Sequence, residues 1–445
     1  MYQKTFHGGV HPDDGKAFAR DVPLRPYLPK GELVFPLSQH IGKPAKPVVQ
    51  KGDHVLAGQL IAQADGFVSA NIASSCSGTV KAIEARRNVL GTTGMAIVIE
   101  NDGQYTLADG VGKEVNYKKL GKDEILKRIA DAGIVGMGGA GFPTHVKLVP
   151  KNPEDIRFVM VNGAECEPYI TCDDQTMRTA PEEVVTGLQI MLTLFPNAEG
   201  VVVIEDNKPE AIAAMEAACA GKERLRVHKV QTKYPQGGER SLISVVAGRH
   251  LKLGMLPADV GCVVDNVATT RAIYRAVCKS EPLMERGFTV SGDGVKSPCN
   301  LIVKLGTQFS EVLEAAGGFV DGAQPEKILC GGPMMGFAMP SLDAAICKNN
   351  NALTVLREDP VAVAQAQQTA CLRCGRCNQA CPLGLTPQMM AYAAERKEYE
   401  RFEKKLYGME CVACGTCTYT CPAKRPLMQL FKQAKAEVMA RKRRG

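Results

Sequence analysis

Two cysteine-rich runs near the C-terminus carry the clearest chemical pattern of this chain. Each run consists of four cysteines followed by a proline: Cys371, Cys374, Cys377, Cys381 and Pro382 in the first, and Cys411, Cys414, Cys417, Cys421 and Pro422 in the second. The C-x₂-C-x₂-C-x₃-C-P spacing is that of a [4Fe–4S] cluster motif. Zinc knuckles and a disulfide framework are the alternatives, but zinc motifs usually pair two C-x₂-C units at longer separation, without a fourth cysteine before proline. The runs therefore predict two [4Fe–4S] clusters and electron transfer.

The two runs are also expected to exchange ligands. Where two such motifs occur together, the fourth cysteine of each run binds the cluster of the other run. The predicted ligand sets are Cys371, Cys374, Cys377 and Cys421 for one cluster, and Cys411, Cys414, Cys417 and Cys381 for the other. Crossed ligation would tie the two runs together and keep the clusters close enough for electron tunnelling.

Composition indicates a multidomain globular protein in a reducing compartment. The chain has 445 residues, enough for about three domains. Of its 17 cysteines, nine lie outside the two runs. These nine are Cys76, Cys166, Cys172, Cys219, Cys262, Cys278, Cys299, Cys330 and Cys347. An odd number at irregular spacing argues against a secreted disulfide scaffold, and we interpret these residues as small packing side chains.

The charge and hydropathy of the chain limit the classes of partner that we expect for it. The formal net charge is +7, and basic residues gather in the tail at 441–444, which we interpret as a solvated end. Without a nucleic-acid motif and with few aromatic residues, nucleic acid is not an expected partner. The N-terminus lacks the apolar core of a signal peptide, and no stretch approaches 18 consecutive apolar residues.

The periodicity of apolar residues changes along the chain. Residues 31–100 read as short β segments, and residues 120–285 alternate between helical and strand patterns, which favours an α/β layer with a mainly parallel sheet. The expected strands are 156–161, 200–204 and 226–230, and the expected helices are 122–132, 181–194 and 209–219. Residues 286–330 return to β character, and residues 386–406 read as an amphipathic helix between the cysteine runs.

A glycine-rich segment at residues 136–144 is the second chemical pattern. It follows a predicted helix, so it is not the dinucleotide fingerprint that links a strand to a helix. Backbone without side chains can nevertheless lie against a flat ring or a phosphate, and Lys147 could supply charge to a phosphate. Glu165, Glu167 and Glu239 lie among glycine or proline just after predicted strands, where α/β sheets bind ligands. Taken singly, each carboxylate would more often be an ordinary solvated loop residue.

These segments together resemble known redox proteins. Residues 136–147 resemble the G-x-G-G-A-G-F-P-T-x-x-K segment of the flavin-bearing NADH dehydrogenase subunit of respiratory complex I, and residues 162–168 are similar to its N-x-x-E-x-E-P segment. Residues 237–239 and 264–269 fall at its later flavin-contacting segments. Over nearly the full length, with residues 6–12, 35–42 and 162–174 included, the chain resembles the family of RnfC proteins, which form part of the Rnf complex, the ion-translocating ferredoxin:NAD⁺ oxidoreductase.

The resemblance extends to two further units. Residues 47–61 and 77–83 resemble the two halves of a biotinyl/lipoyl-type barrel-sandwich, but the hairpin at 65–70 has no lysine to modify, so no swinging arm is expected. Residues 286–330 are similar to soluble-ligand-binding β-grasp domains. One departure from the flavin-bearing protein of complex I is that its single-cluster cysteine region is missing and two ferredoxin-like clusters replace it. Electrons must therefore leave the flavin by a different route.

The resemblance implies a multidomain α/β protein with five parts. These are an N-terminal segment (1–30), a barrel-sandwich (31–112), a Rossmann-like domain that binds FMN and NAD(H) (113–285), a β-grasp domain (286–355) and a helical ferredoxin-like domain with two [4Fe–4S] clusters (356–445). It also implies membrane-embedded partner subunits, a ferredoxin-like subunit among them, and a peripheral position on the cytoplasmic face of the membrane.

The resemblance further implies site residues and a reaction. The residues expected to line FMN are Gly136, Gly138, Lys147, Asn162, Glu165, Gly237 and Asn266. Phe142 would stack near the nicotinamide nucleotide, and Glu167 and Glu239 would contact it. Hydride would pass between NAD(H) and the flavin as a two-electron step, and the clusters would exchange single electrons with the flavin. Carboxylates near the flavin would lower its potential by disfavouring the anionic reduced form.

Two other functions remain open at this point. A soluble flavin and iron–sulfur reductase, such as a cobalamin reductase, has a similar domain content. A non-catalytic ferredoxin-like carrier would keep the clusters but use the glycine-rich segment only as structure. The flavin content of the purified protein, and its response to NADH, would separate an enzyme from a carrier.

Overall fold

A parallel four-stranded sheet forms the centre of the predicted flavin-binding region, in a computed structural model that describes residues 4–252, 254–322 and 324–444. Its strands, in spatial order, are β11 (Leu225–Val230), β10 (Glu199–Glu205), β9 (Phe158–Gly163) and β12 (Cys262–Asn266). All three neighbouring pairs are parallel, so the four carboxyl ends lie along one edge. The sequence predicted β9, β10 and β11. It did not predict β12 as a strand, because only its first three residues are apolar and the polar Asp265 and Asn266 follow them.

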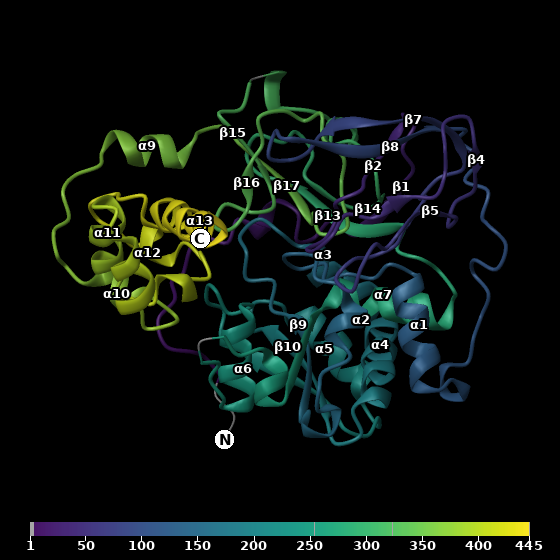
Figure 1. Cartoon of the computed structure of the whole chain (residues 1–445), viewed down its shortest axis with the longest axis horizontal. Helices are drawn as coiled ribbons and strands as arrows, with labels where there is room; N and C mark the ends of the chain where they lie inside the picture. The colour runs from purple at the N-terminus through teal and green to yellow at the C-terminus, as the bar shows by residue number, and fades with distance from the viewer. Residues whose placement is uncertain (1–3, 253, 323, 445) are drawn as a thin grey trace.

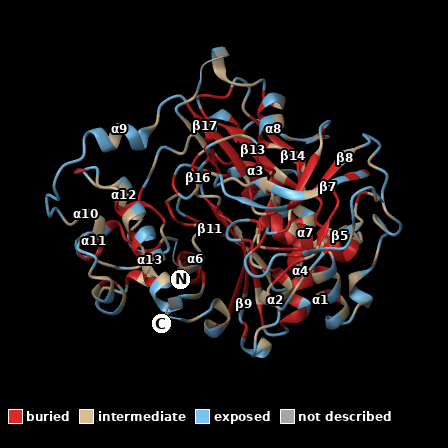
Figure 2. Cartoon of the chain, turned by 45° about the horizontal axis from the view of Figure 1, so that its top comes forward, coloured by how far each residue is buried: buried red, intermediate tan, exposed pale blue. Residues whose placement is uncertain are grey.

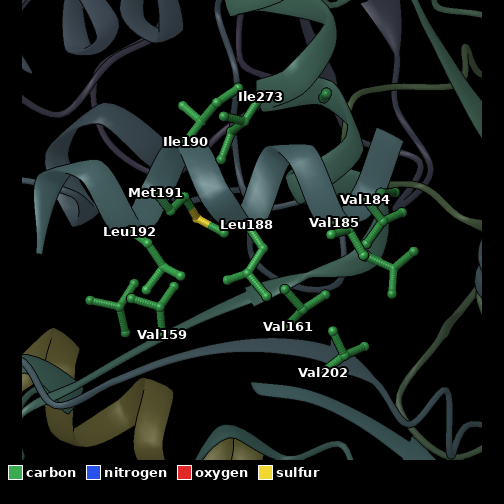
Figure 3. Packing of buried hydrophobic residues seen from close by; sticks show 14 of the residues in the cluster. Val159, Val161, Val184, Val185, Leu188, Ile190, Met191, Leu192, Val202 and Ile273 are labelled. Carbon is green, nitrogen blue, oxygen red and sulfur yellow. The ribbon is translucent and has the colours of Figure 1, made fainter. Parts of the chain in front are cut away.

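Helices cover the faces of this sheet. The covering helices include α1 (Lys122–Asp131), α4 (Pro181–Leu194), α5 (Pro209–Cys219) and α7 (Val267–Cys278). Helices α4 and α5 begin with proline, whose fixed φ suits the first helical position. Figure 3 shows Leu188 of α4 lying over Val161 and Val202 of the sheet, all fully buried. Burial of this kind contributes about 1.5–3 kcal/mol for each large aliphatic side chain and fixes the sheet edge in place.

The predicted barrel-sandwich consists of two small antiparallel sheets. One contains β2 (Leu33–Pro36), β8 (Thr93–Asn101), β7 (Gly78–Arg87) and β4 (His54–Val55), and the other contains β3 (Lys46–Pro47), β5 (Leu60–Gln63) and β6 (Ile72–Ala73). Fully buried Phe35, Ile61 and Ile97 belong to their shared core. The hairpin between β5 and β6 carries Phe67, whose side chain is 80% exposed.

The third sheet is mixed and has six strands. In spatial order these are β1 (Leu24–Tyr27), β14 (Cys299–Lys304), β13 (Glu285–Ser291), β17 (Ala352–Leu356), β15 (Lys327–Cys330) and β16 (Phe337–Ala338). Helix α8 (Phe309–Ala315) buries Phe309 edge-on against Phe288 of β13. Strand β1 comes from the N-terminal segment and pairs in parallel with β14. That segment is therefore an edge strand of the β-grasp sheet, and the pairing of residues this distant in sequence leaves no local signature.

The C-terminal unit is helical and lies to one side of the sheets (Figure 1). It contains α10 (Arg376–Ala380), α11 (Pro387–Glu395), α12 (Thr416–Tyr419) and α13 (Leu427–Arg444). The helix expected over 386–406 is interrupted, because Lys397 has a φ of 59° and ends α11; a short π-helical turn follows at Arg401–Lys405. Helix α9 (Pro360–Ala366) leads to this unit along an exposed path (Figures 1 and 2).

Among the described residues, no helix has both the length and the apolar character that crossing a lipid bilayer requires.

Candidate functional site

Two asparagines meet at the carboxyl edge of the parallel sheet. Asn162 of β9 and Asn266 of β12 are direct register partners. The Asn162 side chain donates to the Gly237 carbonyl oxygen at 2.8 Å, and its own oxygen accepts from the Ala164 N–H. The Asn266 side-chain oxygen accepts from the Ala268 N–H and so caps α7. The sheet edge thus carries a rigid pair of amides at the position where α/β proteins bind ligands.

The glycine-rich segment lies against this edge. It follows α1 and leads into the short helix α2 (Thr144–Lys147), and the Gly136 N–H donates to the Phe142 carbonyl oxygen across its base. Gly138 and Gly139 are exposed. A Cβ on Gly138 would lie 2.9 Å from the Asn266 Cβ, whereas one on Gly139 would meet nothing within 4 Å. The segment therefore presents bare backbone next to the asparagine pair.

Lys147 is paired within the chain. Its Nζ donates to the Val264 carbonyl oxygen at 2.7 Å and lies 3.1 Å from Asp265 Oδ1. Burial by itself would lower the pKa of Lys147, but the charges of Asp265 and Glu239 outweigh it and raise that pKa. The Asp265 carboxylate is fully buried, and its second oxygen has no hydrogen-bond partner among the described residues. A buried carboxylate oxygen without a hydrogen-bond partner is unusual. Beside the Lys147 ammonium group, this oxygen indicates a polar site where the chain itself does not supply every hydrogen bond.

Glu165 caps the helix that follows it. Its two carboxylate oxygens accept from the N–H groups of Asp173 and Asp174 in the first turn of α3 (Cys172–Thr179). Burial raises the pKa of Glu165, and the nearby Lys16 ammonium works in the opposite direction. Glu165 itself has a positive φ of 46°, so the backbone is held in a strained turn at this position.

Two buried lysines hold the backbone on either side of Glu165. Lys16 Nζ donates to the carbonyl oxygens of Glu167 and Ile170, and Lys208 Nζ donates to that of Ala164 at 2.6 Å. Both lysines are 3% exposed or less. The sequence did not identify either residue as part of the site, because each acts on backbone far away in the chain.

The three residues predicted to contact nicotinamide nucleotide occupy different settings. The Glu167 carboxylate accepts from the N–H groups of Met334 and Met335, in the loop between β15 and β16. Glu239 is exposed at the first position of α6 (Glu239–Ala247), and Phe142 is partly buried within the glycine-rich segment. Glu167 therefore connects the site to the β-grasp sheet, and of the three residues Glu239 is the exposed one.

Four cysteines line one cavity in the helical unit. The lining of this cavity includes Cys381, Cys411, Cys414 and Cys417. The chain thus brings Cys381 of the first run to three cysteines of the second, as crossed ligation predicts. We call these four residues the inner cysteines. Burial raises the pKa of the Cys411 and Cys417 thiols, so thiolates there need a positively charged metal centre as partner.

The other predicted ligand set is more open to solvent. Cys371 and Cys374 are exposed, and Cys377 and Cys421 are partly buried. We call these four residues the outer cysteines. Arg373 and Arg376 are exposed between them, and Leu372 is 64% exposed. The outer cysteines therefore lie at a surface with basic and apolar character.

The inner cysteines adjoin the sheet edge through one segment. The Tyr234 hydroxyl donates to the Cys414 carbonyl oxygen at 2.8 Å, and the Gly237 N–H, three residues along the chain, points to Cys166 Sγ at 3.2 Å. Val10, Tyr234, Met334, Ala380 and Cys414 form a common buried cluster with Cys166 against it. Arg240 and Glu410 form an ion pair across the same boundary. The asparagine pair and the inner cysteines are thus parts of one continuous region.

The residues at the sheet edge fit a flat, polar cofactor such as FMN. Bare backbone at Gly138 and Gly139 can face a ring system, amides from Asn162 and Asn266 lie beside it, and the unpartnered Asp265 oxygen can accept a hydrogen bond from a cofactor N–H or hydroxyl group. The inner cysteines bring four sulfur ligands, the donor set of a [4Fe–4S] cluster, to one cavity. The outer cysteines supply four further free thiols, and their grouping on a second cluster stays a prediction.

Comparison with protein families assigns the same units. Residues 4–104 match the "RnfC Barrel sandwich hybrid domain", residues 129–275 the "Nuo51 FMN-binding domain", residues 288–338 the SLBB domain and residues 364–422 the "4Fe-4S dicluster domain". The fold class expected from the sequence is confirmed, and so are FMN and two [4Fe–4S] clusters as the cofactors of this class. The fold and site define a flavin and iron–sulfur oxidoreductase of the NADH dehydrogenase type.

Full-length relatives specify the family. The chain is 44% identical to the RnfC protein of the proton-translocating ferredoxin:NAD⁺ oxidoreductase complex of Clostridium ljungdahlii, covering 98% of this chain and 94% of the relative. It is 38% identical to the counterpart in the Na⁺-translocating complex of Acetobacterium woodii, covering 99% and 98%. It is 39% identical to the counterpart in the ion-translocating oxidoreductase complex of Rhodobacter capsulatus, covering 99% and 84%. The chain belongs to the RnfC family, and these relatives do not support the cobalamin reductase alternative.

One solved structure is similar in part. It is an NAD⁺-reducing [NiFe]-hydrogenase in the H₂-reduced state, at 24% identity and a TM-score of 0.49, covering 71% of this chain and 62% of that one.

Proposed function

We propose that this chain is the peripheral NAD(H)-oxidoreductase subunit of a membrane-bound, ion-translocating ferredoxin:NAD⁺ oxidoreductase. Bound FMN supplies the exchange between two-electron hydride chemistry and one-electron transfer. One observation supports this proposal most directly. The Asn162–Asn266 pair, Tyr234 and the cavity of the inner cysteines lie next to one another in a single continuous region. A nucleotide-reactive edge and an electron outlet adjoin each other within one chain.

The chain's own residues have distinct tasks in this function. Gly138 and Gly139 would let the backbone approach the ring system, Asn162 and Asn266 would orient it, and Lys147 would place positive charge near it. Phe142 and Glu239 would contact the nicotinamide nucleotide. Glu167 would anchor the β-grasp loop beside this site through the Met334 and Met335 N–H groups.

The positions of the two cysteine sets support an order of electron transfer. The inner cysteines adjoin Tyr234 and the flavin-binding edge, so their cluster would exchange electrons with this edge. The outer cysteines are exposed, so their cluster would exchange electrons with a partner protein. The exposed Arg373 and Arg376 suit an acidic, ferredoxin-like subunit on the cytoplasmic face of the membrane.

Cofactor analysis of the anaerobically purified chain tests the activity. We expect release of FMN on denaturation, about eight iron atoms per chain for two [4Fe–4S] clusters, and bleaching of the flavin by NADH. A chain that holds both clusters but contains no flavin and does not respond to NADH would be a carrier, and the proposal would be wrong.

Reversing the charges of Arg373 and Arg376 tests whether the outer cluster exchanges electrons with an acidic partner protein. The variant Arg373→Glu/Arg376→Glu should weaken reduction of the outer cluster by an acidic ferredoxin and reduce the salt dependence of that step, while reduction by dithionite stays unchanged. Lys118→Glu/Lys119→Glu, on an exposed segment before α1, makes the same change in net charge and should leave the reaction unaltered. Equal effects of the two variants would argue for net charge alone and against this docking face.

A further inference from the structure

The N-terminal residues 4–10 form an irregular segment, here called the strap, that is anchored on the flavin-binding domain. The Gln231 N–H donates to the Lys4 carbonyl oxygen, and Lys233 Nζ donates to that of Phe6, both at 2.8 Å. The Phe6 side chain is 6% exposed and packs in the core on one face of the parallel sheet. Val10 and Tyr234 pair in antiparallel fashion through two backbone hydrogen bonds of 2.8 and 2.9 Å.

The same strap contacts the inner cysteines. The Gly9 N–H donates to the Ala380 carbonyl oxygen at 2.9 Å, directly before Cys381. Gly8 packs on Cys381 itself, since a Cβ on Gly8 would lie 2.7 Å from the Cys381 carbonyl oxygen. Gly8 and Gly9 have φ values of +78° and +81°, which favour glycine. The strap therefore contacts, at backbone-to-backbone distance, the one inner cysteine that comes from the other run.

The covalent connection cannot hold the two units in register by itself. Between β17 and the first cysteine run the chain passes through α9, none of whose residues is buried. Fixed positions must come from noncovalent contacts at the boundary. Those contacts include the Tyr234–Cys414 hydrogen bond, the Arg240–Glu410 ion pair, the approach of Gly415 to Met334, the Lys432 ammonium over the Phe337 ring, and the strap. The strap differs from these other contacts because it touches Cys381 and Tyr234 simultaneously, and both lie on the direct route.

We propose that the strap is a positioning element that sets the separation between the flavin-binding edge and the inner cluster, with Gly8 as its contact on Cys381. This inference rests on the proposed function for its electron-transfer consequence. Electron transfer between fixed centres falls steeply with distance, so a displacement of the Cys381 segment slows this step and leaves hydride transfer intact. No atom of the strap takes part in the chemistry.

The test is Gly8→Ala in the full chain. Because alanine cannot occupy this backbone conformation without moving the Cys381 carbonyl, we expect the inner cluster to shift. After mixing with NADH, flavin bleaching should keep its wild-type rate. Cluster reduction should slow by roughly tenfold, which is less than the roughly 100-fold loss that a 1 Å misplacement of reacting groups can cause. In a redox titration followed by EPR, the signal that is lost in Cys381→Ala should change its line shape or midpoint potential, and the outer signal should not.

Gly103→Ala is the matched control. Gly103 has a similar φ of +72°, but a Cβ there meets nothing within 4 Å. This variant carries the same local backbone strain and should retain wild-type kinetics and spectra. If Gly8→Ala behaves like Gly103→Ala, the strap does not set the separation and the proposal is wrong.

A second variant tests the same proposal in case Gly8→Ala does not fold. Val10→Ala keeps the backbone free of strain but removes a buried side chain between Tyr234, Ala380 and Cys414. It should slow cluster reduction in the same selective way, and wild-type kinetics in this variant would overturn the inference. Failure of the proposed function is recognised separately, because the wild-type chain would then bind no flavin. The dithionite-reduced EPR spectra of the variants would still report on the strap.

Discussion

Glu165 and Glu167 are separated by one residue, yet they hold two different parts of the molecule. Glu165 caps α3 and Glu167 accepts from Met334 and Met335 in the β-grasp loop. Sequence reasoning placed both beside the cofactors, and their cofactor roles stay predictions. What their hydrogen bonds add is that each carboxylate also fixes backbone, so its substitution affects structure as well as binding.

Glu167 should make stability depend on pH. Burial raises its pKa to about 7, although the hydrogen bonds from Met334 and Met335 oppose this. Between pH 4.5 and 7 the unfolded chain has released this proton and the folded chain keeps it, so the free energy of unfolding falls as pH rises. Glu167→Gln should reduce that slope by about 1 kcal/mol per pH unit, measured by anaerobic denaturant unfolding. The exposed Glu223→Gln serves as control and should leave the slope unchanged.

The crossed ligand sets give a prediction for single cysteines. Cys381 lines the cavity of Cys411, Cys414 and Cys417, so Cys381→Ala should alter the EPR signal of the inner cluster alone. Cys421→Ala should alter the outer cluster alone. The reverse pattern would mean that each run binds its own cluster and would contradict the pairing.

At the scale of elements, the junction of β12 and α7 combines several tasks in a few residues. Asp265 is buried against Lys147 of α2, and Asn266 pairs with Asn162, caps α7 and donates to Asp173 Oδ2 at 2.6 Å. One strand end therefore links the glycine-rich segment, the sheet and α3. Substitutions here should affect several elements together.

Lys147→Met tests this junction. Removing the ammonium leaves the fully buried Asp265 carboxylate uncompensated, which should lower the free energy of unfolding by about 3 kcal/mol. The double variant Lys147→Met/Asp265→Asn removes both charges and should recover most of the loss in denaturant unfolding of the cofactor-free chain. If FMN affinity stays weak in the recovered double variant, Lys147 also acts on the cofactor. A double variant as unstable as the single one would show that the ion pair is not the cause.

At the scale of the whole molecule, Lys348 joins three domains. It is 1% exposed, and its Nζ donates to the carbonyl oxygens of Asn71 in the barrel-sandwich and Gly133 before the glycine-rich segment, at 2.5 and 2.7 Å. Arg286, also buried, donates to the Lys348 carbonyl oxygen and to that of Met137. Two buried basic side chains therefore connect the sheets to the glycine-rich segment through its backbone.

Lys348 should make the free energy of unfolding depend on pH in a second, higher range. Burial lowers its pKa from 10.5 to about 7. Between those values the unfolded chain binds the proton and the folded chain does not, so stability rises with pH across this window. Lys348→Met should remove about 1 kcal/mol per pH unit from the slope between pH 7 and 9, by anaerobic denaturant unfolding. Lys51→Met, at an exposed position, should keep the slope; an unchanged slope in Lys348→Met would mean that the lysine is already charged in the folded chain.

Much of the fold was predictable from local pattern. The helices α4 and α5 begin and end where their periodicity and N-terminal prolines indicated, and β9, β10 and β11 were recognised as apolar runs. The strands β1 and β17 were not recognised, because each belongs to a sheet through partners distant in sequence. The break of the helix after α11 depends on a single positive φ at Lys397, for which a lysine gives no signal.

The sequence by itself determined the chemistry, because cysteine spacing and a glycine-rich segment are local patterns that only certain cofactors require. Tertiary structure decided the arrangement of that chemistry. It brought Cys381 to the second cysteine run, placed the inner cysteines next to Tyr234, and set Gly8 against the Cys381 backbone. These contacts join residues up to hundreds of positions apart, and their distances depend on packing of the whole chain rather than on any residue's own preference.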